Sequence, residues 1–301
     1  MSRHHAAAAR LSLLAVFGLV SLAHAQEEVP PEDPGAAVWQ AAADAMLHGP
    51  QTIELRNQAV LALPEGYGFV PAKEGAAVME LLGNSTDGRF IGLIFPTTEG
   101  AWFMTVDYEP AGYIEDDDAK EWDADELLDS LKEGTKVGNK QRERMGITPI
   151  EVTRWVEQPA YDATEHRLVW SAEAKEIGVE DQDPTINYNT YVLGREGYIS
   201  LNLITSASAI EAQKPAAHEL LAAVSFNEGK RYSDFDPATD KVAAYGLAAL
   251  IGGVAAKKLG LFAMIGVFLA KFGKLILVGG VALLAGLGKL FKRGKENSTA
   301  A

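Results

Sequence analysis

The last quarter of the chain, residues 240–301, constrains the fold more than any other stretch of the sequence. Residues 240–293 are glycine-rich and contain apolar runs interrupted only by lysine-bearing breaks, at 242–256, 259–270 and 275–288. A helix needs about 20 mostly apolar residues to cross a bilayer core of about 30 Å. No run reaches that length alone, so a helix that crosses the bilayer must include some of the lysines between or beside the runs. Such lysines are tolerated where they lie at the ends of the crossing helix. The sequence therefore predicts a C-terminal transmembrane helical region at 240–293.

The positions of the lysines favour one crossing over two. A lysine at the centre of a bilayer costs about 2.5–3.5 kcal/mol on insertion scales, whereas a lysine at the end of a span reaches the head groups at little cost. A crossing at about residues 274–292 keeps its lysines at the two interfaces. Residues 242–270 would then lie in the interface. A second crossing there stays open if Lys257 and Lys258 face water or a partner helix.

Glycine spacing in this region offers a surface on which helices could associate. Two series recur every seven residues and are out of register with each other: Gly246, Gly253 and Gly260, and Gly266, Gly273 and Gly280. Small residues on one stripe let helices approach closely in lipid. The pattern supports an alternative function, in which the protein forms oligomers or remodels membranes through these helices. Chance alignment of many glycines is the competing explanation.

Charge is divided unevenly between the body of the chain and its tail. Residues 26–240 hold 16 basic and 40 acidic residues, a net charge of −24, whereas residues 241–301 hold nine basic residues and one acidic residue, a net charge of +8. So acidic a domain repels nucleic acid, while the basic tail at 294–301 suits anionic lipid head groups. The chain has no cysteine, so no disulfide supports its fold.

The N-terminus has the composition of a secretory signal peptide. Arg3 and Arg10 lie before or beside the apolar stretch 11–22, and small residues end this segment at position 25. Residues 1–25 are therefore predicted to be cleaved off, with an uncleaved anchor as the alternative. Residues 26–38, with their prolines and acids, indicate a linker. We expect a bacterial envelope protein in the inner membrane, with its main domain on the periplasmic side.

Residues 39–236 are predicted to form one exported α+β domain. Alternating or apolar segments predict strands at 51–63, 89–95, 102–108, 150–157, 166–175, 186–193 and 198–205. Helical patterns lie at 36–47, at 73–82, from 123 to either 134 or 146, and at 209–224. Short glycine-containing connections pair the strands locally, so we expect an antiparallel sheet with flanking helices. In the last strand, the polar Ser200 and Asn202 alternate with apolar residues.

The stretch from Tyr113 to Glu126 is the most distinctive part of the body. Asp123 and Glu126 have the spacing of a capping box at the start of a helix. The acids at 115–118 lack the central glycine and the terminal glutamate of an EF-hand loop, so a solvated, helix-capping face is favoured over a cation site. Tyr113 and Trp122 could line a pocket, but we expect them to be core residues.

No catalytic, cofactor-binding or metal-binding constellation is predicted from the sequence. The histidines of the mature chain, His48, His166 and His218, are far apart and lack the His-Glu-x-x-His spacing of zinc enzymes. The chain also lacks a glycine-rich phosphate loop ending in Lys-Ser/Thr and a Gly-x-Ser-x-Gly elbow. An envelope hydrolase is therefore the least favoured of the functions considered.

Several segments carry a family resemblance. They are LPEGY at 63–67, GLIFP at 92–96, GYIEDDDA at 112–119, NYNT with LGREG at 187–197, and DKVAAYG at 240–246. Together they resemble a bacterial membrane-anchored family catalogued as domain of unknown function 2167, which implies an anchor but no activity. The last strand and helix also faintly resemble exported domains of the PsbP and Mog1 type. We therefore expect a non-enzymatic binding or scaffolding module, with lipid and an envelope protein or a second copy of the chain as partners.

Overall fold

The computed structural model describes residues 34–98, 100–144, 146–180 and 183–251. All of them belong to the second of two compact units, Asp33–Ala301. The predicted signal peptide, the crossing at 274–292 and the basic tail lie outside the described residues.

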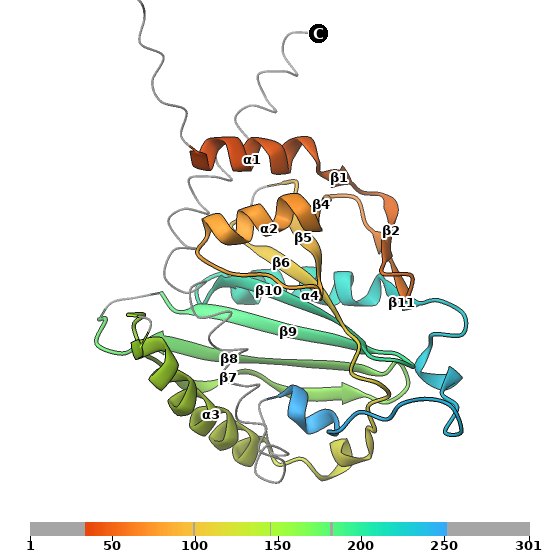
Figure 1. The fold of residues 1–301 in the computed structure, drawn as a ribbon. Coiled ribbons are helices and arrows are strands. Elements are labelled where there is room, and N and C mark those ends of the chain that lie inside the picture. Colours follow the sequence, from red (N-terminus) through yellow and green to blue (C-terminus); the bar gives the residue numbers. More distant parts are fainter. Residues whose placement is uncertain (1–33, 99, 145, 181–182, 252–301) are drawn as a thin grey trace, which may run out of the picture. The chain divides into compact units, whose positions relative to one another are not determined.

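Two antiparallel sheets form the framework of this unit (Figure 1). The large sheet has eight strands, in the spatial order β1 (Leu47–His48), β4 (Tyr67–Pro71), β5 (Phe90–Pro96), β6 (Phe103–Glu109), β10 (Tyr198–Ser206), β9 (Thr185–Leu193), β8 (Arg167–Glu176) and β7 (Ile150–Asp162). The small sheet has the order β11 (Val224–Phe226), β3 (Ala59–Leu63) and β2 (Gln51–Leu55). Each neighbouring pair is antiparallel, and the β5–β6 and β9–β10 pairs confirm the expected pairing of strands that follow one another in the chain.

Helices flank the sheets, which confirms the predicted α+β class. The α-helices in the described residues are α1 (Pro34–Asp44), α2 (Ala72–Leu81), α3 (Ala124–Arg144) and α4 (Ile210–Ala222). Short 3-10 helices are η1 (Asp117–Glu121), η2 (Tyr232–Asp234) and η3 (Leu247–Leu250). Within the described part of the chain, no helix has the length and apolar character needed to span a bilayer.

The two faces of the large sheet are covered by different elements. One face packs against α4 and the small sheet, in a core that includes Leu201 and Leu220. The opposite face, called here the helical face, has two separate covers. The helices α1 and α2 lie on the β4 and β5 side around Leu93 and Phe95. The helix α3 and the 3-10 helix η3 pack on the β7 to β9 side, around Trp170.

β7 is longer than the strand predicted at 150–157 and reaches Asp162. The prediction was too short because Pro159 lacks a backbone N–H and is unfavourable inside a sheet. β7 is the last strand in the sheet order, so its outer side has no strand neighbour among the described residues. Its register against β8 also shifts three times. Bulges and a proline on an edge strand discourage pairing with another chain.

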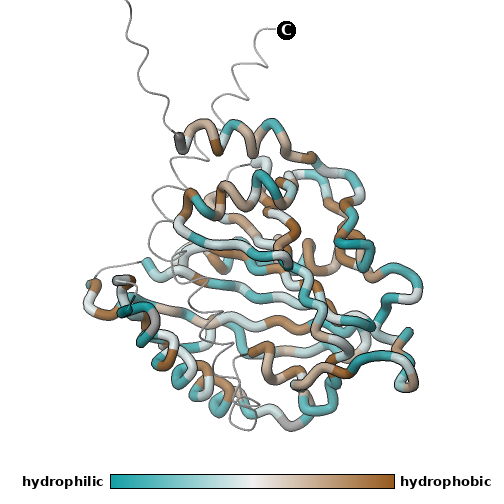
Figure 2. Tube along the Cα trace, viewed as in Figure 1, coloured by the Kyte–Doolittle hydropathy of each residue, from teal (hydrophilic) through white to brown (hydrophobic). Residues whose placement is uncertain are grey.

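α3 begins where the capping pattern predicted a helix. Asp123 Oδ1 accepts hydrogen bonds from the backbone N–H groups two and three residues further on, each at 2.9 Å. The helix continues for 21 residues, which matches the longer of the two predicted lengths. Its buried Leu127 and Leu131 pack in the core, while hydrophilic residues line much of its length (Figure 2).

Replacing Asp123 by alanine should lower the free energy of unfolding by about 1 kcal/mol, the usual cost of losing an N-cap. Chemical denaturation measures this change. Asp123→Asn keeps an oxygen acceptor and should stay close to the native value. Asp125→Ala is the matched control, because Asp125 is also an exposed acid of the first turn but is not the cap. Equal losses in the two alanine variants would contradict the capping role.

Candidate functional site

The helical face of the large sheet carries a group of polar side chains on its three central strands. We call this group the polar strip, and its members are Thr105 and Asp107 on β6, Ser200 and Asn202 on β10, and Asn187 and Asn189 on β9. Directly paired residues of an antiparallel sheet lie on the same face. The pairs Thr105–Asn202 and Asn202–Asn189 therefore form one row across the three strands.

This row is buried but not fully hydrogen-bonded. Thr105, Asn189 and Asn202 expose 1%, 3% and 6% of their surface. Asn202 Nδ2 donates to Asn187 Oδ1 at 3.1 Å, whereas Asn202 Oδ1 and Thr105 Oγ1 have no hydrogen-bond partner in the described part of the chain. Leaving a buried polar atom unpaired costs about 1–3 kcal/mol. The row is therefore a buried polar site with an unpaired acceptor and an unpaired hydroxyl, which makes it the candidate site of the domain.

Residues 236–251, called here the C-terminal strap, are bound to the domain at both ends. Near the first end, Arg195 Nε and Nη2 donate to the two carboxylate oxygens of Asp240 at 2.6 and 2.8 Å. The guanidinium holds the pKa of Asp240 well below its usual range. The N–H of Tyr113 then donates to the carbonyl of Lys241 at 2.8 Å, and the Tyr113 carbonyl accepts a strap N–H at 2.7 Å.

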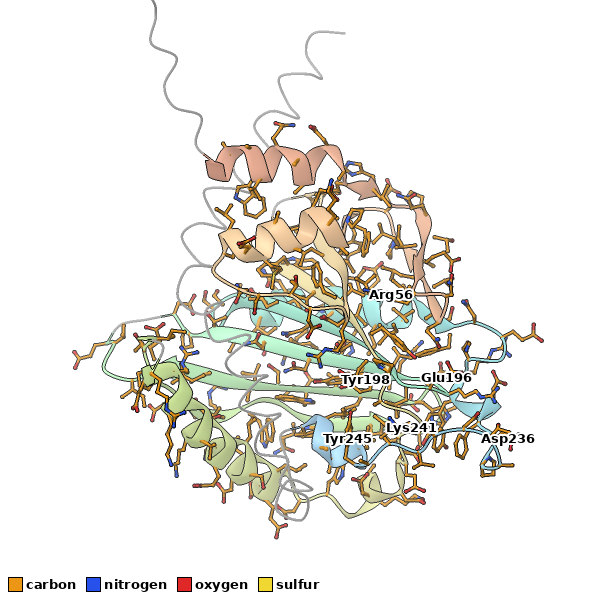
Figure 3. All side chains as sticks on the ribbon, in the orientation of Figure 1. Arg56, Glu196, Tyr198, Asp236, Lys241 and Tyr245 are labelled. Carbon is orange, nitrogen blue, oxygen red and sulfur yellow. The ribbon has the colours of Figure 1, made fainter. Side chains whose placement is uncertain are left out.

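The middle of the strap packs closely against the rest of the domain. Tyr245 shares a side-chain hydrogen bond with Tyr198 at the start of β10, and Figure 3 shows both residues in this region. Asp118 Oδ2 accepts the backbone N–H of Ala248 at 3.0 Å, and burial raises the pKa of that carboxyl. A Cβ at Gly246 would lie 2.7 Å from the same oxygen, so a side chain there would displace the Asp118 carboxylate.

The strap ends beside the polar strip. The Leu250 carbonyl accepts hydrogen bonds from Trp170 Nε1 at 3.1 Å and from the Tyr191 hydroxyl at 3.3 Å. Ile251 is fully buried. Trp170 lies directly opposite Asn189 in the β8–β9 pair, so its side chain is on the helical face next to the row. The strap therefore lies beside the row at Leu250.

This position differs from the one expected for residues 240–251. The sequence placed them at the start of a membrane region, with 242–270 as an interfacial helix. In the structure they form a β-bridge at Val242 and the 3-10 helix η3, both packed on the domain. The remainder of that apolar stretch lies outside the described residues.

His166 belongs to an aromatic stack at the base of the strap. Its ring lies 4.0 Å from that of Tyr232, which lies 4.4 Å from that of Tyr113. Tyr113 in turn stacks on Phe235 at 3.8 Å. Tyr113 and Trp122 both pack against the same core cluster, in agreement with the expectation that they are core residues.

A polar group adjoins this stack. The Tyr161 hydroxyl donates to Asp116 Oδ2 at 2.6 Å and lies 3.0 Å from His166 Nδ1. Because the hydroxyl has a single proton, a neutral His166 must carry its own hydrogen on Nδ1, which leaves Nε2 as an acceptor. Burial raises the pKa of Tyr161, so its hydroxyl keeps that proton. Tyr161 and Asp116 can therefore orient His166 so that its Nε2 is the proton acceptor. A hydrolase would need an acceptor oriented in this way.

The other two histidines of the mature chain lie elsewhere, away from Tyr161 and Asp116. His218 on α4 has its Nε2 2.9 Å from the Tyr188 hydroxyl, and His48 is exposed on β1. Among the described residues, no group of three or more His, Cys, Asp or Glu side chains is placed to hold a metal ion. The acids at 115–118 instead include Asp118, which binds the strap.

The polar strip is only partly visible in the sequence. Asn187 and Asn189, like Ser200 and Asn202, are two positions apart in strands that are otherwise largely apolar. That spacing places each pair on one face of its strand. The pairing of β10 with β6, which completes the row, joins segments far apart in the chain and leaves no local pattern.

Protection of the strap should depend on pH through Asp240. Its folded pKa lies below the unfolded value of about 3.9. The ion pair therefore contributes stability above about pH 4, and this contribution is lost as the pH falls through the folded pKa. Hydrogen exchange at the Ala243 amide, corrected for intrinsic rates, should show protection that declines in acid. Asp240→Asn should give weaker protection at neutral pH and remove this decline.

Asp234→Asn is the control for that experiment. Asp234 accepts the backbone N–H of Arg231 at 2.9 Å within η2, outside the strap. Its replacement should leave protection of Ala243 unchanged. A decline in acid that is the same in the native chain and in Asp240→Asn would show that another group holds the strap.

Two solved structures are distantly similar to this chain. The cyanobacterial PsbP protein (CyanoP) from Synechocystis sp. PCC 6803 is 9% identical with a TM-score of 0.37, and the match covers 61% of this chain and 93% of that one. The Ran-binding protein Mog1p of Saccharomyces cerevisiae is 10% identical with a TM-score of 0.28, and the match covers 58% and 94%. These scores are too low to support a conclusion about this chain. No curated protein matches the sequence.

A family profile matches most of the chain. The family is described as a protein of unknown function (DUF2167), and the match runs over residues 47–281. That span contains every strand of both sheets, the polar strip and the strap. It confirms the resemblance carried by segments such as GYIEDDDA at 112–119. The chain therefore belongs to the DUF2167 family of proteins of unknown function.

Proposed function

We propose that the protein is a non-enzymatic binding or scaffolding module of the bacterial envelope. An N-terminal signal exports its α+β domain, and the apolar region after Ile251 holds it at the inner membrane. The observation that carries this proposal is the C-terminal strap. It joins the domain to the apolar region through fixed contacts rather than through a loose linker.

The strap contacts would limit where a membrane segment could begin relative to the domain. Asp240 is paired at one end and the Leu250 carbonyl at the other, while Leu247 and Ile251 are fully buried between body and strap. A flexible linker would let the domain explore a wide volume. A membrane segment that follows a packed Ile251 would instead hold the domain close to the bilayer in one orientation. That arrangement suits a scaffold, which must present a fixed surface.

The charge distribution supports the same arrangement. The first charged residues after the strap are Lys257 and Lys258, which would be attracted to anionic head groups. The body carries the net charge of −24 found at residues 26–240, so an anionic surface repels it. The two lysines after the strap would therefore be attracted to lipid, while the acidic domain would stay exposed to envelope partners.

Cell fractionation should recover the mature chain, beginning at Gln26, in the membrane fraction. Detergent should extract it, whereas alkali and high salt should not, because a spanning helix is held by lipid rather than by surface charge. N-terminal sequencing of the recovered chain identifies its first residue. Recovery in the alkaline wash would instead support a surface-bound amphipathic helix.

Cross-linking of the same membranes tests the binding role. The full-length chain should be captured with an envelope protein or with a second copy of itself. A chain that stays monomeric and without partners after cross-linking would remove the support for a binding or scaffolding role, even if the membrane location holds.

A single cysteine at Ser298 of this cysteine-free chain tests the number of crossings. One crossing at 274–292 leaves residue 298 in the cytoplasm, so an impermeant thiol reagent should label Ser298→Cys only after lysis. Ser225→Cys is the matched control, because Ser225 is exposed on β11 of the exported domain and should be labelled in intact cells. Labelling of Ser298→Cys in intact cells would show that the chain crosses twice.

A further inference from the structure

The ring of His166 is held in one orientation by contacts on two sides. It stacks on Tyr232 at 4.0 Å, and its Nδ1 lies 3.0 Å from the Tyr161 hydroxyl. That hydroxyl donates its single proton to Asp116, so a neutral ring carries its hydrogen on Nδ1. The other nitrogen, Nε2, is then an acceptor and has no hydrogen-bond partner among the described residues. The ring is accessible, because 27% of the His166 side chain is exposed.

Acidic groups surround this acceptor. Asp116 Oδ2 lies 3.7 Å from His166 Nδ1, and 25% of the Asp116 side chain is exposed. Glu115 and Asp117 are exposed on the same segment, although Asp117 also pairs with Lys120 at 3.2 Å. Burial, together with the three carboxylates at 115–117, raises the pKa of Tyr113 in the aromatic stack. A ligand that carries a positive charge is therefore favoured here, as it is by the net charge of −24 at residues 26–240.

We propose that His166 is the hydrogen-bond acceptor of a binding site for a primary ammonium group. Such a group would donate one N–H to Nε2, and its charge would lie near the Asp116 carboxylate. The inference rests on the proposed function as a binding module and names the chemical class of its ligand. An ethanolamine lipid and a soluble amine present the same ammonium chemistry, so both are sources that the experiment must separate.

His218 provides a comparison within the same domain. Its Nε2 also lies near a tyrosine hydroxyl, 2.9 Å from that of Tyr188, and near a carboxylate, 3.9 Å from Glu157 Oε1. The same carboxylate pairs with Lys214 at 3.5 Å, and a lysine this close repels a second cation. His218 is the more exposed histidine, at 51% of its side chain. Exposure alone would favour binding at His218, whereas the surrounding charges favour His166.

Titration of the full-length protein in detergent tests the site, with ring-nitrogen NMR spectra of labelled histidine as the readout. At about pH 8 an ordinary histidine is neutral and a primary amine is still charged. We expect His166 to carry its hydrogen on Nδ1, and ethanolamine to shift its Nε2 resonance in a saturable way. Choline has the same charge but no N–H, so it should give no saturable shift. The His218 resonances should not respond to either probe.

Two outcomes of this titration would overturn the proposal. One is the absence of a saturable shift at His166 Nε2 with ethanolamine. The other is a shift that choline reproduces, or that His218 shows equally, because either result would indicate general attraction of cations to an acidic domain.

Tyr161→Phe tests how the ring is positioned. Without the hydroxyl, Nδ1 loses its hydrogen-bond partner, so the hydrogen of His166 should move to Nε2. The dissociation constant for ethanolamine should then rise about tenfold, equivalent to about 1.4 kcal/mol. Tyr188→Phe is the matched control beside His218 and should leave the His166 tautomer and the affinity unchanged. An unchanged tautomer and affinity in Tyr161→Phe would overturn the site as proposed.

Lipid composition separates the two sources of the ammonium group. The full-length protein is placed in nanodiscs of phosphatidylcholine, with or without phosphatidylethanolamine. A shift of His166 Nε2 that appears only with phosphatidylethanolamine would assign the ligand to the lipid head group, whereas a response to soluble ethanolamine alone would assign it to a soluble amine. Neither result depends on a cross-linked partner. The ammonium site and the scaffolding role can therefore fail separately.

Discussion

The register of the central strands β6, β10 and β9 is the constraint on which the rest of the structure depends. Side chains alternate between the two faces of a strand, so a shift of one residue in β10 would turn Asn202 into the core and Leu201 out of it. Ile199, Leu201 and Leu203 are fully buried on the face covered by α4 and the small sheet. Their burial fixes the register, and the polar strip on the opposite face follows from it.

That strip lies between the two covers of the helical face. Thr105 Oγ1 and Asn202 Oδ1 are buried there without a partner among the described residues, which is costly. The covers lie on either side, with α2 packed around Leu93 and α3 around Trp170. The strap approaches from the α3 side and presents a backbone carbonyl to Trp170. Backbone is the part of a chain that can meet a polar surface without leaving it unpaired.

Local patterns predicted the elements of the fold better than their assembly. The β9–β10 hairpin and the Asp123 cap depend on residues close in sequence, and both were found where they were predicted. The strap was not predicted, because an apolar, glycine-rich segment has the same composition whether protein or lipid covers it. Its contacts to Asp118 and Trp170 join residues 130 and 80 positions apart. The polar strip likewise depends on long-range pairing, so only the two-residue spacing of its members was visible.

The change in composition at residue 240 is not the end of the packed domain, because the chain stays packed on the domain as far as the structure describes it, up to Ile251. Leu247, Leu250 and Ile251 belong to the same core cluster as Trp170 and the buried leucines of α3. Without the strap, that cluster would lose buried apolar surface and leave Trp170 Nε1 without its acceptor. The core on this side is therefore completed only when the residues that precede the apolar region are in place. The C-terminal strap is thus part of the core, and folding of the domain is coupled to the placement of residues 247–251.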